Sequence, residues 1–592
     1  MAPLAAISTR LSTRTRKLTG ESLPRYGATP TMTAIPLLPQ VEKTTGAETE
    51  PAPRRPPDAL HLLLDVVAAL PLVIFGIADM ARGWRPLFDN AAIALRSYQV
   101  FSRHSPLVGH QVDLHLTSQP VYSLGPLENW LLAVPVHLDQ KQGALWGAVI
   151  FAVIGVTLAI EAAWSAARWW GAVIVATSVL VLFSVRGDVI VDLVWNPWFG
   201  VIWLYTTMAS SWAVATGRLR WWPVALVSAS IVAQCHEVFA PPAIAVCLTA
   251  PVLGVIVRRS RGERVGLGWL GAGAAAGVVS WIAPLVQQLT HHPGNFTVLW
   301  RVAHQRGAKI GVTQALGALG GASRLVPKWL HAPPLHGAFA SVVYVANTFV
   351  GAQWWAVTTL VLLAVITVCA LVTRRHLLAG SAALSLVAAL GTVGAIASVP
   401  SAQVLTFGYV DVMLIPVGTA VWLTLAWALV EVVRPVLQRA LSQGLPSVRK
   451  RAQAVADHLA MLAGVTMVTV LFGWSISSGL TLVGTNAPTI GGWAAVRATD
   501  IGVSAVARVA PRTPFRLELA ESSNNYRFAV VTGMAYLLKT EGFQPLFIGL
   551  AATTFGQGRP NMPVVVVHVP ATGDRVSASV RPSRRSGSPG VH

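Results

Sequence analysis

The first long apolar run of the chain is residues 61–81, HLLLDVVAALPLVIFGIADMA, and the polar stretch RGWRPLFDN follows it directly at residues 82–90. A bilayer core about 30 Å thick is crossed by roughly 20 helical residues. The run is therefore long enough for one crossing. What comes after it would lie at the membrane surface.

Similar apolar runs recur through the chain. Hydrophobic residues make up 54% of the sequence and charged residues only 11%, against about 25% charged in an average globular protein. A lipid-facing surface cannot carry charge cheaply, whereas a soluble protein of this size needs it. We expect eleven spans, at residues 61–81, 143–163, 169–185, 198–216, 221–236, 238–257, 266–286, 352–373, 377–398, 410–431 and 458–480.

Arginine clusters between the runs predict the orientation. If the N-terminus is cytoplasmic, the densest clusters all fall in cytoplasmic connections, as the positive-inside rule requires. They lie at residues 168, 217–220, 258–264, 374–375 and 434–451. Because eleven is odd, the C-terminus is then extracytoplasmic. We expect a multi-pass protein of the plasma membrane with this orientation.

The segments outside the spans predict the domains. Residues 1–57 are rich in Pro, Thr and Ala and are expected to be a disordered cytoplasmic tail. Residues 58–480 form the helical domain, with long outer loops at 82–142 and 287–350. Residues 481–570 are expected to form a small α/β domain and 571–592 a disordered tail. The fold class is an all-α polytopic membrane protein with a small extracytoplasmic α/β domain.

The net charge of +20 does not indicate nucleic acid, because the basic residues lie between apolar runs and not on one face of a soluble domain. The three cysteines, Cys235, Cys247 and Cys369, have the spacing of neither a metal site nor a disulfide framework. No Walker sequence occurs, which argues against nucleotide-driven transport. The residues call for no cofactor.

Asp89 is the first candidate for chemistry. A carboxylate just beyond a span could act as general base on an extracytoplasmic hydroxyl. It could equally cap a short helix that starts at Asn90 or Ala91.

Two further outer connections hold polar residues. Arg186, Asp188, Asp192 and Asn196 lie between the third and fourth spans, where Asn196-Pro197 also has the form of a helix start and the tryptophans beside it could simply anchor the interface. At the end of the fifth span stand Gln234, His236 and Glu237, which could bind a phosphate or form a structural pair.

The order of these motifs resembles that of the GT-C superfamily of polytopic glycosyltransferases. It runs from Asp89 to Gly125-Pro126, Asn196-Pro197, Gln234-x-His236 and Pro293-Gly294-Asn295. The likeness is to actinobacterial members grouped with protein-mannosyltransferase and dolichyl-phosphate-mannose-type enzymes. It covers residues 60–300 in motif order.

The resemblance implies a transferase that moves a hexosyl or pentosyl group from a polyprenyl-phosphate sugar to a cell-envelope acceptor. Asp89 would be the catalytic base, Asp188 or Asp192 an assisting acid, and Arg186 and His236 phosphate-binding groups. Asn196, Gln234 and Glu237 would complete the substrate site. Many members pair two acids in the first loop, whereas Asn90 follows Asp89 here. That departure leaves open whether the site is active and whether a divalent metal ion takes part.

Two other functions remain open. A transporter or flippase of a lipid-linked glycan would place functional charges near the midplane, often in repeated halves. We find no internal repeat, and the polar residues gather at one face. A non-catalytic envelope scaffold would need none of these residues to react.

Overall fold

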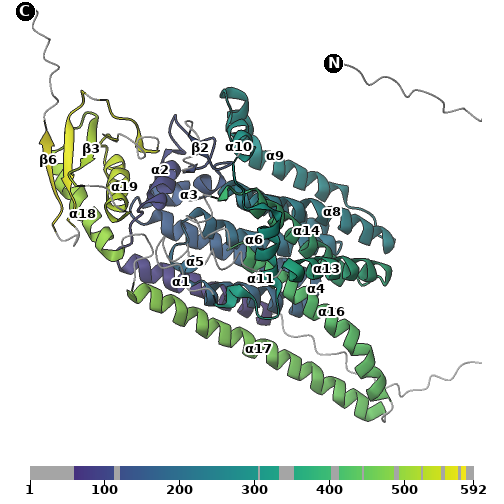
Figure 1. Cartoon of the computed structure of the whole chain (residues 1–592). Helices are drawn as coiled ribbons and strands as arrows, with labels where there is room; N and C mark the ends of the chain where they lie inside the picture. Colours follow the sequence, from purple (N-terminus) through teal and green to yellow (C-terminus); the bar gives the residue numbers. More distant parts are fainter. Residues whose placement is uncertain are drawn as a thin grey trace, which may run out of the picture. The chain divides into compact units, whose positions relative to one another are not determined.

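The computed structural model describes residues 59–112, 120–304, 307–331, 353–401, 412–442, 446–485, 492–521, 525–547, 554–559, 561–570 and 575–581. The expected cytoplasmic tail, residues 1–57, lies outside the described residues. The described part is mostly helical, with a small sheet near the C-terminus (Figure 1). The predicted fold class, a helical polytopic membrane protein with a small α/β unit, is confirmed.

All eleven predicted spans coincide with helices of the described chain. Eight helices are long and apolar enough to cross a membrane. One of them, the 43-residue α4, consists of two arms that meet at Ala167 and Arg168, where the φ of Arg168 is 56°, and the arms match the predicted second and third spans. Helices α6 and α7 match the predicted fourth and fifth spans but fall outside that group of eight.

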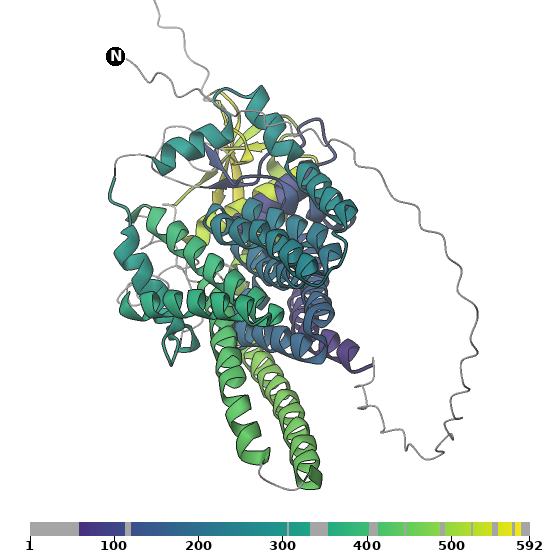
Figure 2. The ribbon, with the colours of Figure 1, turned by 90° about the vertical axis from the view of Figure 1, so that its right-hand side faces the viewer.

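All the span helices follow the predicted order along the chain. Their bounds are α1 Ala59–Ala81, α4 Gly143–Val185, α6 Asn196–Ala215, α7 Trp222–Cys235, α8 Ala240–Ser260, α9 Leu267–Thr290, α13 Gln353–Val372, α14 His376–Ser398, α16 Leu414–Ser442 and α17 Pro446–Thr485. Only residues 443–445 separate α16 from α17, and the two helices run next to each other (Figure 2).

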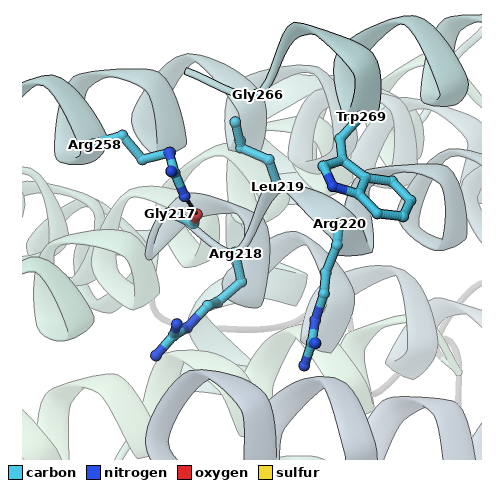
Figure 3. Close-up of a pocket in the computed structure, with 7 residues that line it drawn as sticks. All are labelled: Gly217, Arg218, Leu219, Arg220, Arg258, Gly266 and Trp269. Carbon is cyan, nitrogen blue, oxygen red and sulfur yellow. Dashed lines mark hydrogen bonds between the residues drawn. The ribbon is translucent and has the colours of Figure 1, made fainter. Parts of the chain in front are cut away.

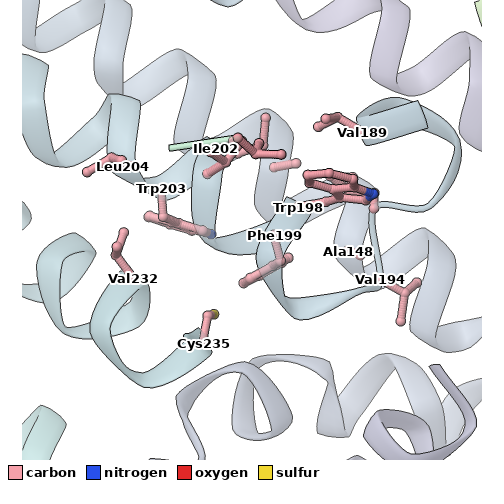
Figure 4. Packing of buried hydrophobic residues seen from close by; sticks show 14 of the residues in the cluster. Ala148, Val189, Val194, Trp198, Phe199, Ile202, Trp203, Leu204, Val232 and Cys235 are labelled. Atoms are coloured by element: carbon pink, nitrogen blue, oxygen red, sulfur yellow. The ribbon is translucent and has the colours of Figure 1, made fainter. Parts of the chain in front are cut away.

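Helix α6 lies at the centre of the core, in contact with α4, α7 and α8. Trp198, Phe199 and Trp203 of α6 are buried, and Val232 and Cys235 of α7 pack beside them (Figure 4). By contrast, only 17% of the apolar stretch of α17 and 22% of that of α13 is buried. Water would penalise so much exposed apolar surface, whereas lipid does not.

The two long loops contain structure of their own. The first holds α2 (Asp89–Gln99), α3 (Leu127–Leu138) and the antiparallel strands β1 (Gln111–Val112) and β2 (Val121–Tyr122). The second holds α10 (Asn295–Ala303), α11 (Gly311–Ser323) and the 3-10 turn η3 (Lys328–His331). Short elements also connect spans, namely α5 (Gly187–Val191), η1 (Leu219–Trp221) and η2 (Glu237–Phe239).

The C-terminal unit is a four-stranded mixed sheet with two helices. Its strands stand in the order β4-β3-β5-β6, with β3 parallel to β4 and β5, and β5 antiparallel to β6. The bounds are α18 Gly492–Val509, β3 Phe515–Leu519, α19 Asn525–Thr540, β4 Pro545–Leu546, β5 Val564–His568 and β6 Ser577–Arg581.

Strand β6 corrects one predicted boundary. It lies inside residues 571–592, which the sequence suggested were a disordered tail. Ser577–Arg581 instead pairs along the whole of Val564–His568. The apolar, β-branched β5 would otherwise leave its backbone groups unpaired on that side.

Candidate functional site

Asp89 is the first residue of α2, directly after the loop that leaves α1. The N-cap position belongs to Phe88, whose φ of 52° is left-handed and which forms no side-chain capping bond. The half-buried Asp89 carboxylate instead accepts a hydrogen bond from Trp195 Nε1 at 3.1 Å. The helix N-terminus also favours a negative charge here. Asp89 is therefore held by a residue from a different loop.

Asp192 is connected to Asp89 by a hydrogen bond to Asn90, the residue after Asp89. Asn90 Nδ2 donates to Asp192 Oδ1 at 2.6 Å, and the Trp195 amide donates to the Asp192 carbonyl at 3.0 Å. The two ends of this turn thus contact two consecutive residues of α2. The 186–195 connection thus brings the carboxylate of Asp192 beside Asn90, the residue after Asp89.

Arg186 belongs to the same group of side chains. It is 1% exposed, and its guanidinium carbon lies 5.5 Å from the centroid of the Trp198 ring. Trp198 in turn meets Trp195 edge to face, with ring centroids 5.3 Å apart. A continuous series of contacts therefore leads from Arg186 to Asp89. Asp188 lies in α5, and its side chain is outside the described residues.

Asn196 and Gln234 make bonds that hold helices together. Asn196 Nδ2 donates to the Cys235 carbonyl at 2.5 Å, and Gln234 Nε2 donates to the Ser280 carbonyl at 2.7 Å. Gln234 Oε1 accepts from the Leu127 amide at the start of α3. A Cβ on Gly125 would overlap Gln234 Oε1, so glycine is needed there. Their predicted substrate contacts stay a prediction.

His236 and Glu237 form the turn between α7 and α8. His236 is buried, its Nδ1 accepts from the Val238 amide at 3.2 Å, and the same nitrogen lies 3.8 Å from Glu237 Oε2. Because His236 Nδ1 accepts from Val238 and 3.8 Å is too long for a hydrogen bond, this nitrogen and Glu237 Oε2 are not hydrogen-bonded to each other. The structural pair and the phosphate contact both stay predictions.

Sequence reasoning missed three polar residues beside this turn. Burial, and then the charges of His236 and Arg96, lower the pKa of His110 to about 3, so its ring is neutral at neutral pH. Arg96 lies 5.1 Å from the centroid of the Tyr122 ring. Burial raises the pKa of Glu128 well above its ordinary value. One signal was available, since Arg96 follows Asp89 by seven residues, or about two turns of one helix face.

Strand β2, which carries Tyr122, is fixed by Asn295 from the second loop. Asn295 Nδ2 donates to the Tyr122 carbonyl at 2.9 Å, and the Tyr122 amide donates to Asn295 Oδ1 at 3.2 Å. The Pro-Gly-Asn turn that the sequence singled out thus connects the two long loops.

The C-terminal unit contacts the loop that leads into Asp89. The Phe88 amide donates to Thr532 Oγ1 at 2.9 Å, and the Phe88 ring meets Phe528 edge to face at 5.2 Å. Arg85 Nε forms an ion pair with Asp500 Oδ1 at 2.9 Å. No local sequence signal predicts contacts between residues so far apart in the chain.

One group of metal-ligating side chains occurs among the described residues, and it is not at Asp89. His61, Asp65 and Glu161 offer ligand atoms within 4.8 Å of one another. His61 and Asp65 belong to the first part of α1, whereas Asp89 follows the last residue of that helix. The expectation that the protein needs no cofactor stays a prediction.

Comparison with known proteins gives a structural likeness only. No family model and no curated protein matches the chain. Among solved structures, it is similar to ArnT from Cupriavidus metallidurans bound to undecaprenyl phosphate, with a TM-score of 0.47 and 14% identity over 87% of this chain and 94% of that one. The apo structure of the same protein gives a TM-score of 0.45 at 14% identity.

Both TM-scores are below 0.5, so no residue role is carried over from these structures.

Proposed function

We propose that this protein is a membrane glycosyltransferase that moves a sugar from a polyprenyl-phosphate donor to an extracytoplasmic cell-envelope acceptor. The observation that carries the proposal is the placement of Asp89 in the first turn of α2, where Trp195 holds its carboxylate and Asn90 connects it to Asp192. The donor class follows from the motif order in the sequence. A site in the loop directly after a membrane span would lie where a lipid-linked donor presents its phosphate.

The proposed reaction is a displacement at the anomeric carbon. Asp89 accepts the proton of the acceptor hydroxyl as its oxygen attacks that carbon, and the bond from the carbon to the phosphate oxygen breaks. The polyprenyl phosphate leaves with the bonding electron pair. Cationic and dipolar groups near the leaving phosphate, for which we propose Arg186 and His236, would stabilise its charge.

Asp192, and Asp188 beside it in sequence, are proposed as assisting acids. Asp192 acts on Asp89 through the turn at residues 192–195. At one end of this turn Asp192 accepts from Asn90, and at the other end Trp195 donates to Asp89. Glu237, Asn196 and Gln234 are proposed to shape the substrate site from the end of α7. In this proposal the face that carries Asp89 is extracytoplasmic.

Transfer from a labelled polyprenyl-phosphate sugar in membranes tests the proposal. We expect Asp89→Asn to lower transfer by about 10²–10⁴-fold, as removal of a general base does. Asp139→Asn is the matched control, since Asp139 lies in the same loop and its carboxylate only accepts from the amides of Lys141 and Gln142. It should transfer at the wild-type rate. Full transfer by a well-expressed Asp89→Asn variant would remove Asp89 as the base, and no transfer by the wild type would refute the function.

A further inference from the structure

A cavity of ≈ 350 Å³ lies at the far end of α6 from the candidate site. Helix α6 begins at Asn196, beside Trp195, and its 20 residues end at Ala215, about 30 Å away along the helix axis. The turn after α6, the end of α8 and the start of α9 meet there. The cavity is lined by Gly217, Arg218, Leu219, Arg220, Arg258, Gly266 and Trp269 (Figure 3).

The two connections around the cavity carry a large excess of positive charge. Residues 217–221 and 258–266 contain six arginines and one acid, Glu263, which gives a net charge of +5 (6 − 1). Glu263 pairs with Arg258 at 3.2 Å. One acid cannot balance this cluster, so the cavity favours an anion.

Two of the arginines cap the C-terminal end of α6. Arg258 Nη1 donates to the Gly217 carbonyl and Arg261 Nη1 to the Thr216 carbonyl, each at 3.2 Å. These bonds satisfy carbonyls that the helix end leaves unpaired. Of the three arginines that line the cavity, Arg258 is therefore also a capping residue, and we call the other two, Arg218 and Arg220, the cavity-facing pair.

The cavity-facing pair is arranged differently. Both side chains are exposed and extend in the same direction in Figure 3. The hydrogen bond described for the Arg220 guanidinium, to Ser165 Oγ, is long at 3.4 Å. Gly266, on the cavity wall, is the N-cap residue of α9, and a helix N-terminus adds a partial positive charge. These groups could together bind a phosphate.

An apolar surface adjoins these charges. Trp269, on the cavity wall, is 51% exposed, and its neighbour Leu267 is 73% exposed. The same helix exposes Val278 and Ile282 further along its length. A free phosphate would use only the arginines, whereas a phospholipid would use both surfaces, with its acyl chains along α9.

We propose that this cavity binds the phosphate headgroup of an anionic phospholipid. In the proposed orientation the cavity opens at the cytoplasmic face, where anionic lipids attract basic segments. The site is separate from the proposed sugar transfer and does not depend on it.

Native mass spectrometry of the purified full-length protein tests this proposal. The protein is titrated with phosphatidylglycerol, with phosphatidylcholine of the same acyl chains, and with inorganic phosphate. We expect phosphatidylglycerol to bind most tightly and Arg218→Gln/Arg220→Gln to weaken that binding roughly tenfold or more. The control Arg374→Gln/Arg375→Gln removes two exposed arginines that belong neither to the cavity wall nor to the charge cluster around it, and should stay within about twofold of the wild type.

Three results would overturn the proposal. They are equal binding of the two lipids by the wild type, equal losses in both double variants, and displacement of phosphatidylglycerol by millimolar inorganic phosphate. The last would assign the cavity to free phosphate. If the double variant does not fold, Arg220→Gln alone should show a smaller loss that is still specific for phosphatidylglycerol.

Discussion

Asn90 sits between the two carboxylates of the proposed site. It is 3% exposed, its Nδ2 is bonded to Asp192 at 2.6 Å, and its Oδ1 is buried without a partner among the described residues. An amide can donate to Asp192, and a carboxylate can do so only when it is protonated. The residue type at position 90 therefore sets how many negative charges residues 89, 90 and 192 carry together.

Replacing Asn90 with Asp should make transfer sensitive to pH. Residues 90 and 192 would then be adjacent carboxyls that share one proton at low pH and repel each other once both ionise. Activity relative to the wild type should fall as pH rises from 6 to 8. The reciprocal double variant Asn90→Asp/Asp192→Asn has a single carboxylate at these two positions, as the wild type does. Its activity relative to the wild type should therefore not change with pH. Parallel pH profiles for the wild type and the single variant would contradict the assignment.

Glu128 is expected to be a protonated acid in the folded protein. Burial raises its pKa well above the ordinary value of 4.5, so the folded state holds a proton that the unfolded state releases. Stability is therefore lost as pH rises above 4.5, by about 1.4 kcal/mol for each pH unit until the folded pKa is reached.

Glu128→Gln mimics the protonated acid and should melt at a higher temperature than the wild type at pH 8, with a smaller difference at pH 6. Glu541→Gln, at an exposed position, should keep the wild-type pH dependence. Thermal melting of the purified proteins at both pH values measures this, and a lower melting temperature for Glu128→Gln at pH 8 would refute a neutral Glu128.

Predictability from sequence differs among these residues. Asp89, Arg186 and Asp192 could be picked out because charge near a span is conspicuous, and the structure brings all three together. Glu128 and His110 were missed because their burial depends on tertiary packing, such as that of α3 against α7, which no local sequence pattern shows. Asn196 and Gln234 were recognised as motif residues, yet sequence could not show that their amides bond to backbone carbonyls of neighbouring helices.

At the scale of elements, the contact between α19 and the start of α2 positions Asp89. Phe88 holds a left-handed backbone conformation, which for a residue of this kind costs about 1–3 kcal/mol. The buried Thr532 hydroxyl accepts a hydrogen bond from the Phe88 amide. A Cβ on Gly533 would lie only 2.5 Å from Leu87 Cδ2, so the two backbones are packed closely. The C-terminal unit thus fixes the residue before the proposed base.

Thr532→Val should lower kcat of transfer by about tenfold with little change in KM. The variant keeps the shape of the side chain but leaves the Phe88 amide without its acceptor, which costs about 1–3 kcal/mol. Thr532→Ser restores the hydroxyl and should restore kcat. A Thr532→Val enzyme with normal kcat, or a Ser variant as slow as the Val variant, would exclude this positioning role.

The hydrophobic pattern of the sequence predicted most helices and strands, but not all of them. Apolar runs of about 20 residues identified every span helix, because the length of a span is set by the membrane and not by tertiary contacts. The kink of α4 was expected as a break between two spans. Strand β6 was missed because Ser577–Arg581 has little apolar character and becomes a strand only by pairing with β5.

At the scale of the whole molecule, the proposed orientation predicts which helix ends face each side. Ser260 ends α8 near the arginine-rich cavity, and Thr290 ends α9 near Asn295. Both side chains are exposed. In a Cys369→Ser background, in which only the buried Cys235 and Cys247 remain, Ser260→Cys should react with a membrane-impermeant maleimide only in inverted vesicles.

Thr290→Cys should show the opposite pattern and react in intact cells. Labelling is measured by the mass added to the purified protein. Reaction of both cysteines from the same side would contradict a crossing by α9, and reversed labelling would reverse the orientation.

The bond between Phe88 and Thr532 joins residues 444 positions apart, and this has a consequence for biosynthesis. At 5–20 residues per second, the ribosome reaches Thr532 roughly 20–90 s after Phe88. Until then the loop before Asp89 has no C-terminal unit to order it. If that contact is needed for transfer, a nascent or truncated chain already inserted in the bilayer would not consume lipid-linked sugar, and activity would begin only after the ribosome has passed Thr532.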